Sequence, residues 1–263
     1  MKSIMLAIAV PAALALLGCN SAKANFVPPT LGSAGSFAVL GGTTVTSTGN
    51  TVLNGNLGVY SGSAITGFPP GIVNGTTYTS VNGNGAVAEQ AQSDALAAYN
   101  TLTSEPVTET LTGQDLGGLT LTPGVYFFSS TAQLTGTLIL SGTGTFVFQI
   151  GSGLTTASSS SVVLEDGAEA DDVFWQVGSS ATLGTGTSFN GSIVALTSIT
   201  FDTGANLYGS ALALNGAVTL DDNDINVPGV VPVPEATTVL AGVLLLLPLG
   251  ASTLQALRKK RTA

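Results

Sequence analysis

The sequence contains no histidine, a single cysteine, and no lysine or arginine between residues 25 and 227. Nucleic-acid recognition requires basic side chains on the phosphates, so that segment offers no nucleic-acid-binding surface. Without histidine, a Ser-His-Asp triad, a histidine general base and a histidine-ligated metal site are excluded. One cysteine can form neither an internal disulfide bond nor a cysteine-rich zinc site. We therefore predict no nucleic-acid partner, no cofactor and no metal in the functional site.

Acidic residues are concentrated where basic residues are missing: fourteen of the fifteen Asp and Glu residues lie between residues 25 and 227. Such a surface would be repelled by anionic lipid or acidic polysaccharide. Clustered carboxylates suit Ca²⁺, but the Gly-Gly-x-Gly-x-Asp repeat of calcium-binding β-rolls is missing. The alternative is acidic turns that keep an uncharged fold soluble and protect strand edges. The clusters are Glu165-Asp166, Glu169, Asp171-Asp172 and Asp221-Asp222-Asn223-Asp224.

The N-terminus predicts a signal peptide over residues 1–24. A lysine at position 2 precedes an apolar run, Ile4–Leu17, that is short for a membrane span. The small-x-small triplet Ala22-Lys23-Ala24 would place the mature start at Asn25. The run that ends at Cys19 resembles a lipobox, which would make Cys19 a lipidated N-terminus. Either alternative implies export.

The C-terminus predicts a second targeting segment. A proline-stiffened linker over residues 228–236 ends in the motif Val233, Pro234, Glu235, Ala236. Residues 237–263 follow as an apolar stretch and the basic cluster Arg258–Arg261; the uncharged part would span roughly 31 Å as a helix. This arrangement resembles the PEP-CTERM sorting signal, which implies an exosortase-type partner and delivery to the cell surface. Ala236 departs from the usual second proline, and a plain single-pass anchor with the basic cluster in the cytoplasm is the alternative.

Short strand-like segments recur at a nearly constant step in the second half of the sequence. Four of them align without gaps at steps of 19, 18 and 19 residues: Val162–Gly167, Ala181–Gly186, Ile199–Gly204 and Val218–Asn223. In another register, Phe148–Ser152 matches Trp175–Ser179 across a longer loop. A repeat of roughly 18 to 20 residues is the size of one β-solenoid coil. A β-sandwich also has closely spaced turns, but phase-locked repeats favour the solenoid, with an inward ladder of Leu164, Leu183, Phe201 and Leu220.

A different unit precedes this array. The Ala-rich stretch around residues 86–103 predicts an amphipathic α-helix, with Leu96, Tyr99 and Leu102 at three-residue steps. Its narrow stripe of small residues should allow it to lie closely against a flat sheet. Residues 37–60 again predict strands, and Gly67–Gly71 predicts a tight turn. The predicted order is strands, one helix, then strands.

Because side chains alternate across a strand, the residue before each inward position should point outward. The predicted outer row is Val163, Thr182, Thr200 and Thr219, beside a row of Ser161, Ser180, Ser198 and Ala217. Thr is common on exposed strands because it is β-branched and polar. Stacked coils would nevertheless space equivalent residues roughly 4.8 Å apart, close to a repeat of the ice lattice. A rigid array of this kind loses little side-chain entropy when it docks.

Several separate motifs occur in an order that resembles the microbial ice-binding protein family. They are Leu31–Leu40, Gly42–Gly49, Gly55–Val59, Thr66–Gly71, the Ala-rich helix and Leu121–Tyr126, with continued similarity from Gln149 to Val227. The resemblance implies a mainly β fold over residues 25–227: a right-handed, discontinuous β-solenoid of triangular section with one long α-helix packed along a side. It also implies that the first and last strands lie near each other. In this family one flat face binds ice, giving thermal hysteresis, inhibition of recrystallisation, or adhesion to ice.

The residues that we predict to bind ice lie on the outward-facing positions of this array. They are Thr44, Thr46, Thr48, Thr66, Ser180, Thr182, Gly184, Ser198, Thr200, Asp202, Ala217 and Thr219. Glu165, Asp202 and Asp221 are expected to interrupt the surface with hydrated charge, and Val163 to break the threonine row. We therefore expect moderate activity from a monomeric body whose partner is the ice crystal surface.

Two other function classes remain open from the sequence. Parallel β-helices also host polysaccharide-cleaving enzymes, but lyases of that kind generally need basic residues, and adjacent carboxylates such as Asp171 and Asp172 would face opposite ways in a strand. We therefore predict that the protein is not an enzyme. A cell-surface adhesin or matrix β-solenoid without ice activity fits the anchor, linker and repeats equally well.

Overall fold

The computed structural model describes residues 29–229. The predicted signal peptide and Cys19, the Val233–Ala236 motif and the apolar segment over 237–263 lie outside these residues. Within residues 29–229, no helix combines the length and the apolar character that crossing a membrane requires.

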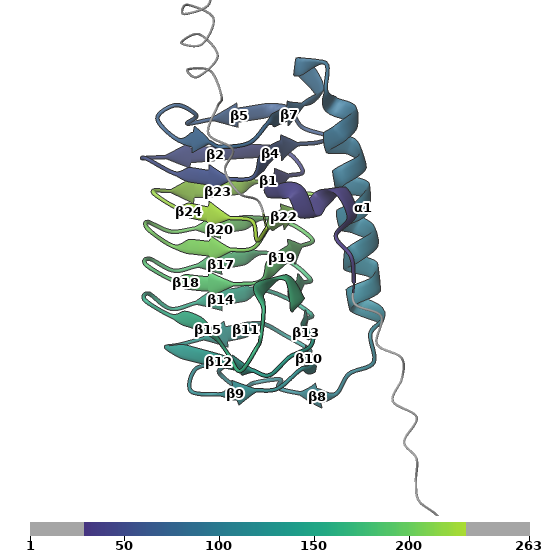
Figure 1. Ribbon diagram of the computed structural model, residues 1–263, viewed down its shortest axis with the longest axis vertical. Helices are drawn as coiled ribbons and strands as arrows, with labels where there is room; N and C mark the ends of the chain where they lie inside the picture. The colour runs from purple at the N-terminus through teal and green to yellow at the C-terminus, as the bar shows by residue number, and fades with distance from the viewer. Residues whose placement is uncertain (1–28, 230–263) are drawn as a thin grey trace, which may run out of the picture.

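The described chain forms three parallel sheets, which we call sheets A, B and C (Figure 1). Sheet A has the order β7 (Thr77–Thr79), β4 (Asn56–Val59), β1 (Phe37–Gly41), β22 (Ala211–Ala213), β19 (Ser192–Ala195), β16 (Val173–Val177), β13 (Phe146–Ile150), β10 (Gly124–Phe128) and β8 (Glu109–Thr110). Sheet B has the order β11 (Ala132–Leu134), β14 (Leu154–Thr156), β17 (Ala181–Leu183), β20 (Ile199–Phe201), β23 (Val218–Asp221), β2 (Thr44–Thr48) and β5 (Ala64–Thr66). Sheet C has the order β6 (Ile72–Val73), β3 (Val52–Asn54), β24 (Asp224–Asn226), β21 (Asn206–Tyr208), β18 (Ser188–Asn190), β15 (Ser161–Glu165), β12 (Thr137–Ser141) and β9 (Thr120–Leu121).

The chain visits the three sheets in the repeating order A, B, C, so each complete coil contributes one short strand to each sheet. The coils on either side of α1 are incomplete: β7 leads into α1, and β8 of sheet A is followed directly by β9 of sheet C. Glycine permits the sharp corners: Gly186 and Gly204 occupy equivalent corners one coil apart, with positive φ of 67° and 70°. Mainly β structure, parallel pairing and a single α-helix confirm the coarse fold prediction for residues 29–229. The arrangement fits the triangular solenoid, whose right-handed sense stays a prediction.

The interior between the three sheets is apolar and partly aromatic. Tyr126, Phe148, Trp175 and Phe189 form a continuous stack, in which the rings of Phe148 and Trp175 lie 3.8 Å apart and nearly parallel. The Trp175 indole N–H donates a hydrogen bond to the carbonyl of Asn190 at 3.0 Å, so this buried donor is satisfied. The stack ties neighbouring coils together through their shared core.

The helix α1 (Gly85–Ser104) matches the predicted range and runs along the outer side of sheet A (Figure 1). Its buried face is Ala88, Ala91, Ala95, Ala98 and Leu102, and alanine permits close approach to the sheet. Leu96 is 47% exposed, so its predicted place on the apolar stripe is wrong. Short 3₁₀ helices cover Gly32–Ser36 (η1), Ser80–Asn82 (η2) and Ala170–Asp172 (η3).

The first and last strands pair side by side, as the resemblance implied. Strand β1 pairs with β22, β2 with β23 and β3 with β24, although these partners lie far apart in the sequence. The N-terminal coils therefore extend the stack beyond its C-terminal coil, and α1 returns the chain to the opposite end (Figure 1).

Candidate functional site

The three outer faces of the molecule differ in what covers them. The outer face of sheet A is buried by α1 and η1, which pack on Val125, Val147, Phe174, Val194 and Leu212. Most outward side chains of sheets B and C are exposed or half-buried. A flat surface for an extended ligand must therefore belong to sheet B or sheet C.

Sheet B carries an unbroken row of six threonines. The strand register places Thr155 beside Thr182, Thr182 beside Thr200, and so on through Thr219, Thr46 and Thr66. Gln133 continues the row at the β11 edge. Neighbouring strands lie roughly 4.8 Å apart, so the row presents one methyl and one hydroxyl group at each such interval.

The hydroxyl groups of these six threonines make no hydrogen bond to any residue in the described part of the chain, whereas three hydroxyls at the margins of the face, those of Thr48, Ser180 and Ser198, are engaged. The Ser180 and Ser198 hydroxyls accept hydrogen bonds from the backbone N–H groups of Ser198 and Ala217 at 3.3 and 3.2 Å. The Thr48 hydroxyl donates to Asp221 at 2.7 Å. The central row therefore keeps its hydrogen-bonding capacity for an external partner.

Small residues flank the row on the side where each strand begins. Thr44 stands beside Ala64 in the register, and Gly153, Ser180, Ser198 and Ala217 hold the corresponding positions on the other coils. None of these side chains projects far enough to screen the threonines. The surface is therefore flat and accessible along its length.

Beside the six threonines, carboxylates lie along the opposite margin of the row. At the β11 end, exposed Asp115 pairs with Gln133 and so extends the row with a charged residue. Asp221 is beside Thr48 at the end of β23, and its carboxylate accepts hydrogen bonds from the hydroxyls of Thr203 and Thr48. These two hydrogen bonds lower the pKa of Asp221 against a smaller opposing effect of burial. Asp202 follows β20 at the same margin and is exposed.

Beneath the threonine row, sheet B is fixed by two ladders of inward side chains. One ladder is aliphatic: Ala132, Leu154, Ala181, Ile199, Val218 and Val45 are all buried, and Ile65 ends it. The other contains Leu183, Phe201 and Leu220, as predicted. The predicted fourth member, Leu164, is wrong, because it lies on sheet C beside Leu140.

Other predictions at the same coil are wrong for the same reason. Ser161, Val163 and Glu165 belong to β15 of sheet C, so they are neither in the outer rows of sheet B nor an interruption of them. The long loop between β15 and β16 lengthens this coil. The gap-free alignment of the four repeats therefore matches a segment of sheet C, which begins at Val162, with three segments of sheet B. Thr155, which the sequence reasoning missed, occupies the sheet B position instead.

A signal for Thr155 was present in the sequence. Phe148 pairs with Trp175 on sheet A, and the same longer step separates Thr155 from Thr182 on sheet B. The twelve predicted site residues, from Thr44 to Thr219, all lie on sheet B or directly beside its strands. Eleven of them are exposed or half-buried at this face, whereas Gly184 is buried.

No group of three or more metal-ligating acidic, histidine or cysteine residues is present within residues 29–229.

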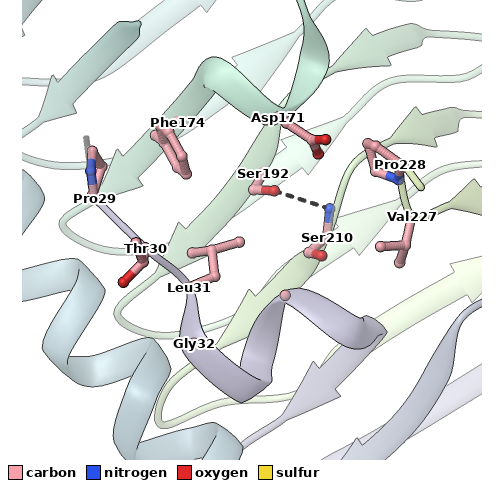
Figure 2. Close-up of a pocket in the computed structure, with 11 residues that line it drawn as sticks. Pro29, Thr30, Leu31, Gly32, Asp171, Phe174, Ser192, Ser210, Val227 and Pro228 are labelled. Atoms are coloured by element: carbon pink, nitrogen blue, oxygen red, sulfur yellow. Dashed lines mark hydrogen bonds between the residues drawn. The ribbon is translucent and has the colours of Figure 1, made fainter. Parts of the chain in front are cut away.

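A hollow of about 390 Å³ lies where both ends of the described chain meet (Figure 2). Its lining includes Pro29, Leu31, Asp171, Phe174 and Val227. Burial, with the nearby charges of Asp172 and Glu169, raises the pKa of Asp171. Ser192 and Ser210 also line this hollow, and the Ser192 hydroxyl accepts a hydrogen bond from the backbone N–H of Ser210 at 3.3 Å (Figure 2). No hydrogen bond within residues 29–229 joins Asp171 to either serine, so the hollow does not show a nucleophile paired with a base.

Sequence comparison finds relatives over most of the chain. The sequence profile of the family described as Ice-binding-like matches residues 39–226. The chain is 56% identical over 225 residues to an ice-binding protein of Nostoc sp., covering 81% of this chain and 82% of that protein. It is 36% identical over 215 residues to an ice-binding protein of Colwellia sp., covering 75% and 83%.

Solved structures show the same similarity. An ice-binding protein from an Antarctic biological consortium aligns with a TM-score of 0.72 and 44% identity, covering 86% of this chain and 96% of that one. An ice-binding protein from the Antarctic ascomycete Antarctomyces psychrotrophicus aligns with a TM-score of 0.72 and 40% identity, covering 76% and 98%.

Proposed function

The chain belongs to the ice-binding-like family, a family of non-enzymatic proteins, and we propose that it binds ice through the outer face of sheet B. The observation that carries this proposal is the row of six threonines in register, Thr155, Thr182, Thr200, Thr219, Thr46 and Thr66. It is exposed or half-buried at every position, and its hydroxyls have no partner among the described residues.

The mechanism follows from the spacing and stiffness of this surface. Methyl groups at intervals of roughly 4.8 Å confine water between them, while the adjacent hydroxyls hydrogen-bond that water in fixed positions. Water ordered in this way merges with the growing ice lattice and holds the protein on it. Because β-branched side chains already have few rotamers, little entropy is lost on adsorption.

The ligand also explains the charge distribution of the face. Ice is neutral, so no basic side chain is needed to attract it, and charge on the face would keep hydration water in place. The carboxylate of Asp221 lies at the margin of the face, where it accepts hydrogen bonds from the hydroxyls of Thr48 and Thr203. Asp202 remains exposed at the same margin, so we propose moderate activity.

Substitutions at the centre of the row test this proposal. The double variant Thr200→Tyr, Thr219→Tyr places two large rings on the flat face, and we expect thermal hysteresis and ice faceting to be lost while the circular dichroism spectrum is retained. The matched control is Thr120→Tyr, an exposed threonine on sheet C, which should keep full activity. Activity that survives in the double variant would move the site to another face. A folded parent protein without any effect on ice would contradict ice binding and favour a surface adhesin.

We propose further that the protein is exported as a monomeric body and held at the cell surface through residues 228–263, by the PEP-CTERM-like signal Val233–Ala236 and exosortase-type machinery. The sequence motifs at both ends support this step. The intact mass of the protein recovered from cells would show a start at Asn25 or a lipidated Cys19. A mass that retains residues 1–18 would contradict export through this signal.

A further inference from the structure

The outer face of sheet C carries a shallow groove that ice binding by sheet B does not use. The groove has a volume of about 210 Å³ and crosses β18, β21 and β24. Two parallel rows of side chains form it, one of Ser188, Asn206 and Asp224 and the other of Asn190, Tyr208 and Asn226. Three strands span roughly 10 Å across the sheet, so the groove accommodates a short segment of an extended ligand.

Tyr208 occupies the centre of this groove with its ring in solvent. It is 46% exposed and is the one aromatic residue among the exposed large hydrophobic side chains of residues 29–229. The same ring borders a second hollow of about 310 Å³, on the side of Leu164, Ala168 and Pro228. Both sides of Tyr208 are therefore open to a ligand that extends beyond the groove.

The polar side chains around Tyr208 are held in place by the sheet. The Asn206 side-chain oxygen accepts a hydrogen bond from the backbone N–H of Asp224 at 2.7 Å. The Asn190 amide donates to the carbonyl of Val162 at 2.7 Å, and the Asn226 amide donates to one oxygen of Asp224 at 3.1 Å. Such fixed groups lose little conformational entropy on binding.

These side chains still have polar atoms to offer. The amide N–H groups of Asn206, the second oxygen of Asp224 and the hydroxyls of Ser188 and Tyr208 have no hydrogen-bond partner among residues 29–229. The groove therefore presents donors and acceptors together, directly beside an apolar ring. This combination complements a ligand that carries hydroxyl groups at the edge of an apolar ring face.

The absence of basic residues and the presence of Asp224 in the groove exclude negatively charged ligands. No lysine or arginine lies between residues 25 and 227, and Asp224 forms part of the groove wall, so phosphates, sulfates and uronic acids would be repelled. A divalent cation is not favoured either, because no group of three metal-ligating side chains occurs in the described part of the chain. A neutral, hydroxyl-rich ligand meets both conditions.

We propose that the sheet C groove binds a neutral polysaccharide, with one sugar ring stacked on Tyr208 and the hydroxyls of that ring and its neighbours hydrogen-bonded to Ser188, Asn206 and Asp224. This site is separate from the threonine row, because it lies on a different sheet. The protein can hold the polysaccharide and ice at the same time. Its body would thereby attach a glycan-coated surface to ice.

Titration calorimetry with three neutral oligosaccharides, cellohexaose, laminarihexaose and mannohexaose, tests the proposal on the full protein. We expect saturable binding of at least one. The substitution Tyr208→Ala should weaken it roughly tenfold or more, as removal of a central aromatic contact does, whereas Tyr208→Phe, which keeps the ring, should bind within about twofold of the parent. Ile72→Ala is the matched control, because Ile72 is 54% exposed on the same sheet but lies outside the groove.

Measuring ice activity in the same variants distinguishes sugar binding by sheet C from ice binding by sheet B. Tyr208→Ala should retain ice faceting, and the double variant Thr200→Tyr, Thr219→Tyr should retain sugar binding. A folded parent protein that binds none of the three sugars, or a Tyr208→Ala variant with unchanged affinity, would overturn the sheet C site whatever the ice measurement gives. Sugar binding without ice activity would support the site and contradict only the function of sheet B.

Discussion

At the scale of the residue, the contrast between free and engaged hydroxyls separates the centre of the sheet B face from its margins. The threonines of the row leave their hydroxyls to solvent, whereas Ser198 uses its hydroxyl to accept a hydrogen bond from the backbone N–H of Ala217 at 3.2 Å. Serine in those flanking positions therefore stabilises the coil corner. The threonines of the row instead present their methyl and hydroxyl groups to the solvent.

Lowering the pH should reduce the folding stability that ionised Asp221 contributes at the margin of this face. Its folded-state pKa is lowered by the hydroxyls of Thr203 and Thr48, so Asp221 stabilises the fold above its unfolded pKa of about 3.9. That contribution is lost as the pH falls through the lower folded-state pKa. In thermal unfolding between pH 7 and pH 2, the variant Asp221→Asn should lose less stability than the parent below about pH 4. Parallel curves for the two proteins would contradict this coupling.

Residue-level prediction from the sequence succeeded where the coil length is constant and failed where it changes. Thr182, Thr200 and Thr219 were found because successive coils repeat at almost the same step. Val163 was placed on the wrong sheet and Thr155 was missed, because the loop from Asp166 to Asp172 lengthens one coil. The groove around Tyr208 was not foreseen, since it depends on which strands of sheet C become neighbours.

At the scale of the element, α1 shows how a weakly amphipathic sequence can still define a buried face. Four alanines and Leu102 are buried against sheet A. The Gln149 side chain donates hydrogen bonds to the carbonyls of Leu102 and Glu105 at 2.7 and 2.8 Å, which satisfies the end of the helix. The sequence predicted the helix and a narrow stripe of small residues that packs closely on a sheet, but three-residue spacing wrongly placed Leu96 on that stripe.

A larger residue on the buried face of α1 should therefore destabilise the protein. Ala95 is fully buried, so Ala95→Leu must displace the helix from sheet A at a cost of about 1 to 3 kcal/mol. Ala97→Leu is the matched control on the exposed face of the same helix and should change stability by less than about 0.5 kcal/mol. Denaturant unfolding of both variants measures the difference. Equal stabilities would show that the helix does not pack closely.

At the scale of the whole molecule, residues 29–229 form their fold without ion pairs among themselves, because they contain no lysine or arginine to pair with their Asp and Glu residues. Several carboxylates, such as those of Asp94, Asp166 and Asp221, accept hydrogen bonds from hydroxyl or backbone N–H groups instead. Like charges on one compact body repel each other, and added salt screens that repulsion.

We therefore expect salt to stabilise this protein. Raising the NaCl concentration from about 10 to 300 mM at pH 7 shortens the screening length several-fold, so the midpoint of thermal unfolding should rise. The expected direction is opposite to that of a protein held together by surface ion pairs. A falling midpoint, measured by differential scanning calorimetry, would mean that repulsion among the acidic residues is negligible.

The pairing of β1, β2 and β3 with β22, β23 and β24 has a consequence for how the chain reaches its native state. The first strands to leave the ribosome need partners that are synthesised last, so the earliest coils cannot acquire their full pairing during synthesis. A parallel topology of such high contact order folds slowly. Folding can therefore be completed only after the last coil has emerged, and such a delay would suit the export that we propose.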